Sequence, residues 1–197
     1  MTISRRRFER KIGNRRYLKC FFIATEGANT EPQYFEIFNN NDSLIKVKHL
    51  KGKHQSAPAK VLDRMQRYLN ENGLRKTDEA WLVVDKDSWS NAQLDVLYQW
   101  TNDHTNHGLV VSNSKFEYWL LLHFEDGNGI ATPWQCSTRL KHYLPDYVKD
   151  IEKAKLLPGI NKAIERARRR DQPRCQDWPR TTGTTVYRLV EKIMAPS

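Results

Sequence analysis

Short apolar runs that alternate with helical patterns constrain the fold of this chain more than any other feature of its sequence. The expected strands are residues 17–24, 44–50, 80–84 and 109–111. The expected helices are residues 32–40, 57–70, 91–101 and 116–124. Strands that alternate with helices are typical of a parallel sheet covered on both faces. We therefore predict an α/β fold with a parallel sheet of about four strands flanked by helices.

The pattern changes after Glu125. From Pro133 to the end the sequence predicts helices and no strong strand. These helices are expected at about 136–144, 146–156, 159–170 and 184–194. Three parts follow from this organisation: a basic N-terminal arm (1–16), an α/β core (17–130) and a helical extension packed on the core (131–197).

Length and cysteine usage place the chain in a broad class. A chain of 197 residues fits one domain. Its three cysteines are odd in number, far apart and without a CxxC pair, which is typical of reduced thiols in a cytoplasmic protein. No apolar run approaches the ~20 residues of a membrane span, and no apolar signal core follows the basic N-terminus. We expect a cytoplasmic protein that has no membrane partner.

The formal net charge of +10 is unevenly distributed. One basic cluster lies within residues 1–19 and a second within residues 166–174. Two basic blocks beside a neutral-to-acidic middle favour a polyanion, either DNA or RNA, as partner. The alternative is a solvated tail and a solvated helix face. The candidate nucleic-acid-binding residues are Arg5, Arg6, Arg7, Lys51, Lys53, Asn113, Lys115, Arg168, Arg169 and Arg170.

Acidic residues follow two of the expected strands. Glu26 comes directly after the first strand, and Gly27 and Thr30, a possible helix cap, come next. Asp85 and Asp87 come after the third strand. Parallel neighbouring strands place their carboxyl ends at one edge of the sheet, where open α/β sheets build their sites. We therefore expect these three carboxylates to converge.

The Asp85–Asp87 pair indicates a cation. Residues two apart on a strand point to the same side, ~7 Å apart. At an effective dielectric of ~20 two carboxylates at that separation repel by ~2.4 kcal/mol, which a divalent cation would remove. Oxygen ligands suit Mg²⁺ or Mn²⁺. The alternative is a solvated loop in which the aspartates cap a helix.

Two further acids are candidate ligands. Glu31 lies in the first turn of the expected helix, where its alternative role is to stabilise the helix dipole. Glu117 lies in an otherwise apolar helix, where a carboxylate is costly to bury unless it is paired. It is expected to bind metal or to pair with Lys115, Lys86 or an arginine.

Aromatic and histidine side chains leave alternatives open. The tryptophans in expected loops either stack on bases or pack against the protein; they are Trp89, Trp134 and Trp178. His123 lies between leucines and Phe124, and we expect a core residue rather than a metal ligand.

A Glu-Gly pair after one strand and an Asp-x-Asp motif after a later one resemble the Toprim domain of topoisomerases, bacterial primases and OLD-family nucleases. The resemblance implies that Glu26 is a general acid or base and that Asp85 and Asp87 are catalytic residues that hold Mg²⁺. Glu26 is expected to lie against the metal as a further ligand. The Glu-Gly-x-x-Thr-Glu run at 26–31 is similar to nuclease members, in which the second acid, here Glu31, joins a second metal site.

Over residues 16–192 the chain resembles the RloB-like family. The runs at 26–35, 112–124 and 184–190 carry this resemblance. It implies a Mg²⁺-dependent Toprim-type nuclease of DNA or RNA, the effector of a phage-defence or restriction-linked system with an ATPase partner. The alternative is a non-catalytic module that binds nucleic acid or docks on the ATPase. The sequence leaves the oligomeric state open.

Overall fold

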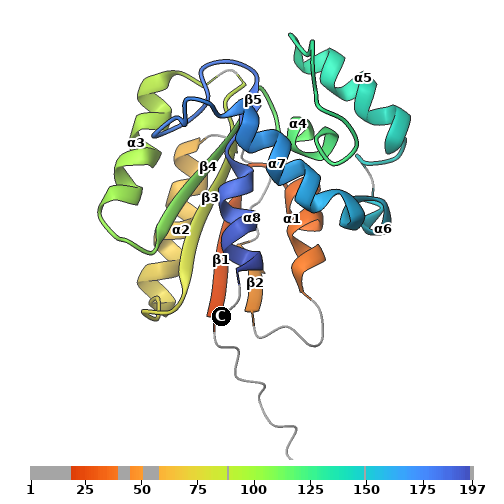
Figure 1. Ribbon diagram of the computed structural model, residues 1–197. Coiled ribbons are helices and arrows are strands. Elements are labelled where there is room, and N and C mark those ends of the chain that lie inside the picture. Colours follow the sequence, from red (N-terminus) through yellow and green to blue (C-terminus); the bar gives the residue numbers. More distant parts are fainter. Residues whose placement is uncertain (1–18, 40–44, 51–57, 88, 149, 196–197) are drawn as a thin grey trace, which may run out of the picture.

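The computed structural model describes residues 19–39, 45–50, 58–87, 89–148 and 150–195. A five-stranded sheet in the order β2-β1-β3-β4-β5 forms its centre (Figure 1). The strands are β1 (Lys19–Thr25), β2 (Ile45–His49), β3 (Glu79–Asp85), β4 (His107–Asn113) and β5 (Gly183–Thr184). β1 to β4 are parallel, and β5 is antiparallel to β4. The predicted α/β fold is confirmed, and a short fifth strand completes the sheet.

Helices cover both faces of the sheet because successive strand side chains point to opposite sides. Phe22 and Leu82 face a core beneath α2 and α3, and Ile23 and Val83 face a second core beneath the other helices. In Figure 1 α3 lies to the left of the sheet and α1 to the right. The helices are α1 (Thr30–Phe35), α2 (Pro58–Asn72), α3 (Asn91–Asn102), α4 (Glu117–Leu121), α5 (Pro133–Tyr143), α6 (Lys153–Leu156), α7 (Ile160–Arg170) and α8 (Val186–Met194), with 3₁₀ turns η1 (Glu36–Phe38) and η2 (Leu157–Gly159).

The predicted helix over 146–156 is wrong for most of its length. Only Lys153–Leu156 is α-helical. The backbone N–H of Ile151 donates to the side-chain oxygen of Gln33 on α1, at 2.8 Å. A helix would have directed this N–H to the carbonyl four residues earlier. A contact with a residue 118 positions away therefore replaces the local helical bond.

The C-terminal residues are part of the sheet and of its cover. Two hydrogen bonds join Thr185 to Val111 of β4. The Thr185 N–H donates to the Val111 carbonyl (3.0 Å), and the Val111 N–H donates to Thr185 Oγ1 (2.9 Å). Lys192 of α8 binds the Glu79 carboxylate at the start of β3, at 3.0 Å. The expected extension therefore contributes β5 and α8 to the α/β layers.

Two sequence expectations about class can be compared with the structure. Cys20, Cys136 and Cys175 are free thiols, as expected. Among the described residues, no helix combines the length and the apolar character that a membrane span requires.

Candidate functional site at the carboxyl ends of the strands

Glu26 lies between the ends of β1 and β3. Its backbone N–H donates to the Val83 carbonyl (2.9 Å), which continues the pairing of the two strands. Its carboxylate accepts from the Asp85 N–H through Oε2 and from the Trp89 indole N–H through Oε1, each at 3.1 Å. Two donors therefore fix the orientation of the Glu26 side chain.

The side chain of Glu31 points back from the first turn of α1 toward the end of β1. Its carboxylate is buried and accepts from the Gly27 N–H at 3.0 Å. A Cβ built on Gly27 would overlap both oxygens of this carboxylate. Thr30 is not the helix cap, because α1 already includes it. The cap position is Asn29, whose side chain makes no cap bond.

The charges of four carboxylates act on one another. Burial raises the pKa of Asp85 well above its ordinary value, and the charges of Glu31, Glu117 and Glu26 raise it further. Burial likewise raises the pKa of Glu31 to about 7, with Glu117 and Glu26 adding to the effect. The pKa of Glu26 is also raised, chiefly by burial. These four residues, here called the acidic cluster, come together from three segments of the chain: the turn from β1 into α1, the end of β3 and the start of α4.

Glu117 is the first residue of α4 and has a cation beside it. The Lys115 ammonium lies 4.0 Å from its carboxylate, at the outer limit of an ion pair. Glu117 nevertheless raises the pKa of both Glu31 and Asp85. Glu117 therefore lies beside Lys115, as one interpretation expected, and its charge also acts on the other members of the acidic cluster.

Asp87 lies outside the acidic cluster. β3 ends at Asp85, and Asp87 follows in a turn, where its N–H donates to the Ser114 carbonyl at 3.1 Å. The prediction that the two aspartates share one strand face is therefore wrong, because the strand ends too early. Asp87 is exposed, and its charge contributes to the raised pKa of Glu26.

The acidic cluster suits a hard divalent cation by its donor chemistry. All four side chains offer carboxylate oxygens, the ligands that Mg²⁺ and Mn²⁺ prefer. Within the described ranges, no three His, Cys, Asp or Glu side chains are arranged as a ready-made metal site. Binding of a cation would therefore have to draw these carboxylates closer together.

The predicted nucleic-acid-binding residues fall into three groups. Arg5, Arg6, Arg7, Lys51 and Lys53 lie outside the described residues. Asn113 and Lys115 lie next to the acidic cluster at the end of β4, and the Asn113 amide donates to the Pro179 carbonyl at 3.0 Å.

The third group, the α7 arginines, is bound to the chain's own acceptors. Arg169 lies 3.1 Å from the Asp126 carboxylate, and Arg170 donates to the Asp126 carbonyl at 3.2 Å. Arg168 pairs with Glu191 of α8. Part of the positive charge of this cluster is thus neutralised within the protein.

The aromatic candidates have different roles. Trp178 is fully buried, and of the two alternatives it therefore packs against the protein. Trp89 orients Glu26, although the two are 63 residues apart and no local pattern links them. Trp134 is 73% exposed on α5. His123 is a core residue, as expected, and its ring contacts the Tyr34 hydroxyl (3.2 Å) and the Trp119 carbonyl (3.0 Å).

A comparison with protein families gives one match. The family model described as RloB-like protein matches residues 21–193. No curated protein and no solved structure matches the chain.

Proposed function

The chain belongs to the RloB-like protein family, and we propose that it is a nuclease of the Toprim type that hydrolyses phosphodiester bonds of DNA or RNA with Mg²⁺ or Mn²⁺. The observation that carries this proposal is the acidic cluster. Glu26, Glu31, Asp85 and Glu117 converge at the carboxyl ends of parallel strands, where sites of open α/β sheets lie.

The electrostatics of the acidic cluster support a cation-binding role. Burying carboxylates near one another disfavours their ionised forms, and this accounts for the raised pKa values of Glu31 and Asp85. A cation would reverse that preference. Asp85, Glu31 and Glu117 would hold it, with Asp87 and Glu26 at the rim. When bound, the cation supplies charge stabilisation at the phosphate and lowers the pKa of a bound water.

Glu26 is suited to move a proton. Burial raises the pKa of Glu26 above its ordinary value, which is the direction that makes a carboxyl group a more effective general acid or base near neutral pH. The N–H groups of Asp85 and Trp89 hold its carboxylate in a fixed orientation. In the proposed reaction it takes a proton from the attacking water or gives one to the leaving oxygen.

The wider role in the proposal follows from the family resemblance. RloB-like proteins occur beside restriction and phage-defence genes, often with an ATPase. In this proposal the chain is the nuclease subunit of such a system. Adding an ATPase encoded beside it to the assay tests whether that partner is required.

The test is cleavage of plasmid DNA and of tRNA by the purified chain in Mg²⁺ or Mn²⁺, with EDTA as the blank. We expect Glu26→Gln to reduce the cleavage rate at least about 100-fold, within the range that general acid–base groups contribute. Asp85→Asn removes a proposed cation ligand and should also reduce the rate. Glu71→Gln and Asp95→Asn neutralise exposed acids of α2 and α3 and serve as matched controls. Cleavage by Glu26→Gln and Asp85→Asn at the same rate as by the controls would contradict the mechanism. Binding without cleavage, even with the ATPase added, would favour a non-catalytic module.

A further inference from the structure

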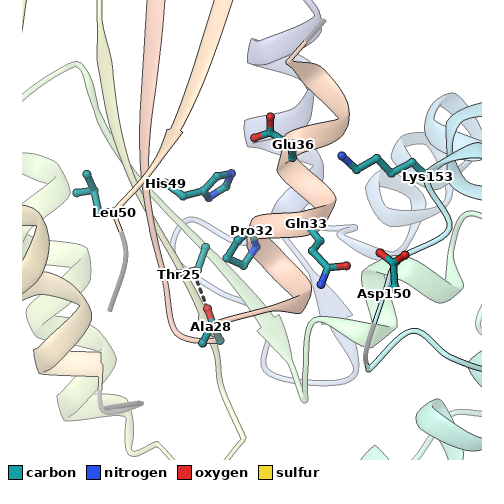
Figure 2. A pocket seen from close by; sticks show the side chains of 10 residues that line it. Thr25, Ala28, Pro32, Gln33, Glu36, His49, Leu50, Asp150 and Lys153 are labelled. Carbon is teal, nitrogen blue, oxygen red and sulfur yellow. Dashed lines mark hydrogen bonds between the residues drawn. The ribbon is translucent and has the colours of Figure 1, made fainter. Parts of the chain in front are cut away.

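Arg64 of α2 is held against the carboxyl ends of β1 and β2. Its Nη1 group donates to the Thr25 carbonyl (3.0 Å) and to the Leu50 carbonyl (3.2 Å). Thr25 is the last residue of β1, and Leu50 directly follows β2 (Figure 2). Two carbonyls from neighbouring strands therefore fix the position of the guanidinium next to the turn that carries Glu26.

The positive charge of Arg64 has no counter-charge within the described residues. Burial lowers the pKa of its guanidinium, and none of the described carboxylates counteracts this effect. Three other arginines of the described chain are half-buried like Arg64, and each has an acidic partner: Arg139 pairs with Glu125, Arg166 with Asp126 and Arg188 with Asp171. A charge that is partly withdrawn from water without a counter-charge is costly, and an anionic ligand would remove this cost.

The remaining donors of Arg64 suit a phosphate. Nη1 is occupied by the two carbonyls, whereas Nε and Nη2 have no hydrogen-bond partner in the part of the chain that the structure describes. Neither atom is among the described polar atoms that are enclosed without a partner, and both are therefore open to a ligand. Nε and Nη2 form one edge of the planar guanidinium, which can donate two parallel hydrogen bonds to a phosphate.

Arg64 and Glu26 lie on the same side of the sheet. α2 covers the core that contains Leu82, and Trp89, which donates to the Glu26 carboxylate, packs against that same core. Thr25, whose carbonyl Arg64 binds, directly precedes Glu26 in the sequence. Because successive phosphates of a strand are only a few ångströms apart, a strand with one phosphate at the acidic cluster would bring the next toward Arg64.

The other side of these strand ends is less suited to a phosphate. Thr25 and Leu50 also line a pocket of about 450 Å³ on the side of α1. Figure 2 shows Glu36 of α1 and Asp150 around this pocket. Their carboxylates repel an anion. A phosphate is therefore expected on the side of α2, where Arg64 lies.

We propose that Arg64 binds a backbone phosphate of the nucleic acid, next to the phosphate at the acidic cluster. This inference rests on the proposed function, since it takes a phosphodiester strand as the substrate. In this arrangement the Thr25 and Leu50 carbonyls orient the guanidinium, and its Nε and Nη2 groups donate to the phosphate oxygens. Arg64 binds the strand and takes no part in proton transfer at Glu26.

The test measures binding without hydrolysis. A labelled single-stranded oligonucleotide is titrated with the full chain in EDTA, and fluorescence anisotropy gives the affinity between about 50 and 200 mM salt. We expect Arg64→Gln to lower the affinity about 10-fold at low salt, as expected for the loss of hydrogen bonds between charged groups. The dependence of log affinity on log salt should become shallower by about 0.7, the value for one phosphate contact on a single strand. Arg67→Gln removes an exposed charge one turn along α2 and should keep the wild-type salt dependence.

Two further measurements separate phosphate binding from a purely structural role. Arg64→Lys keeps a positive charge without the guanidinium edge, and it should retain the wild-type salt dependence at a lower affinity. In the unaltered chain the oligonucleotide should shift the NMR signal of the Arg64 Nε–H, which tests the contact even if the variants fail to fold.

A wild-type salt dependence in Arg64→Gln, an equal change in Arg67→Gln, or an unshifted Arg64 signal would overturn the proposal. Failure of the nuclease mechanism is a separate result. That mechanism is judged by cleavage in the Glu26→Gln variant, and the binding assay needs no cleavage.

Discussion

At Gly27 the backbone approaches the Glu31 carboxylate so closely that there is no room for a side chain. The Gly27 N–H donates to this carboxylate, and a Cβ at the same residue would overlap its oxygens. The backbone φ of Gly27 is not positive, and left-handed geometry is therefore not the reason for a glycine here. Its role is to let Glu31 reach the acidic cluster.

This close approach predicts the effect of Gly27→Ala. The added methyl group must displace the Glu31 carboxylate or strain the turn, at a cost of about 1–3 kcal/mol in the free energy of unfolding. Glu31→Ala removes the obstructing carboxylate. In that background we expect Gly27→Ala to cost at least about 1 kcal/mol less, a coupling typical of residues in contact. Urea unfolding of the wild type, the two single variants and the double variant measures this coupling. An equal loss of unfolding free energy from Gly27→Ala in both backgrounds would contradict the contact between Gly27 and Glu31.

The raised pKa of Glu31 also predicts how the free energy of unfolding depends on pH. Its pKa rises from 4.5 to about 7 on folding, and the folded state therefore binds more protons than the unfolded state between these values. The resulting stabilisation is present below pH 4.5 and is lost as pH rises to 7. Glu31 alone accounts for a loss of about 3 kcal/mol in the free energy of unfolding over this pH range.

Urea unfolding at pH 5 and pH 8 in EDTA checks this prediction. Relative to wild type, Glu31→Gln should lose less stability between the two pH values. Glu71→Gln, an exposed acid on α2, should follow the wild-type curve. With Mn²⁺ in place of EDTA, the proposed cation site should stabilise the wild type more at pH 8 than at pH 5, since it requires ionised carboxylates. A Glu31→Gln curve parallel to wild type would show that Glu31 is not the titrating group.

At the scale of elements, regular structure could be predicted where a local pattern specifies it. The apolar strands and the amphipathic helix α2 have such patterns, and they form where expected. Glu26 and Asp85 could be placed at one edge of the sheet because parallel strands align their ends. The end of β3 before Asp87 and the pairing of Glu26 with Trp89 depend on contacts between distant segments, which no local pattern encodes.

The edge strand β2 is completed by the side chain of Asn39, eight residues before Val47. The Asn39 amide donates to the Val47 carbonyl (2.9 Å) and accepts from the Val47 N–H (2.8 Å). It thus pairs both backbone groups of Val47 on the open edge of the sheet, where unpaired groups favour association with another chain.

Asn39→Ala should therefore weaken β2. We expect a loss of about 1–3 kcal/mol in the free energy of unfolding, the usual cost of leaving backbone groups without a partner. Hydrogen exchange at the Val47 amide should become faster at the same time. Asn72→Ala removes a single exposed bond to the Tyr68 carbonyl and is the control. Unchanged protection of the Val47 amide against hydrogen exchange would mean that Asn39 does not stabilise β2.

At the scale of the whole molecule, a net charge of +10 coexists with an acidic cluster that repels phosphates. The excess charge could be read from the sequence, but its availability to a partner could not. Asp126 lies about 40 residues before the arginines that it binds. Only the fold shows that α7 directs its arginines toward a neighbouring acidic loop.

Asp126→Asn tests whether these arginines are available to nucleic acid. Asp126 contacts Arg166 at 2.9 Å and Arg169 at 3.1 Å. Removing its charge should raise affinity for a single-stranded oligonucleotide by about two- to fivefold at low salt. It should also steepen the dependence of log affinity on log salt, by about 0.7 for each additional phosphate contact. Fluorescence anisotropy in EDTA between 50 and 200 mM salt measures both quantities.

The control for this variant is Asp95→Asn, which makes the same charge change on the exposed face of α3. Exposed ion pairs contribute about 0–1 kcal/mol to stability, and we therefore expect both variants to remain folded. If both increase affinity equally, the net charge of the molecule governs binding. If Asp126→Asn alone does so, the α7 arginines contact the nucleic acid, and Asp126 limits how strongly the chain holds a polyanion beside its own carboxylates.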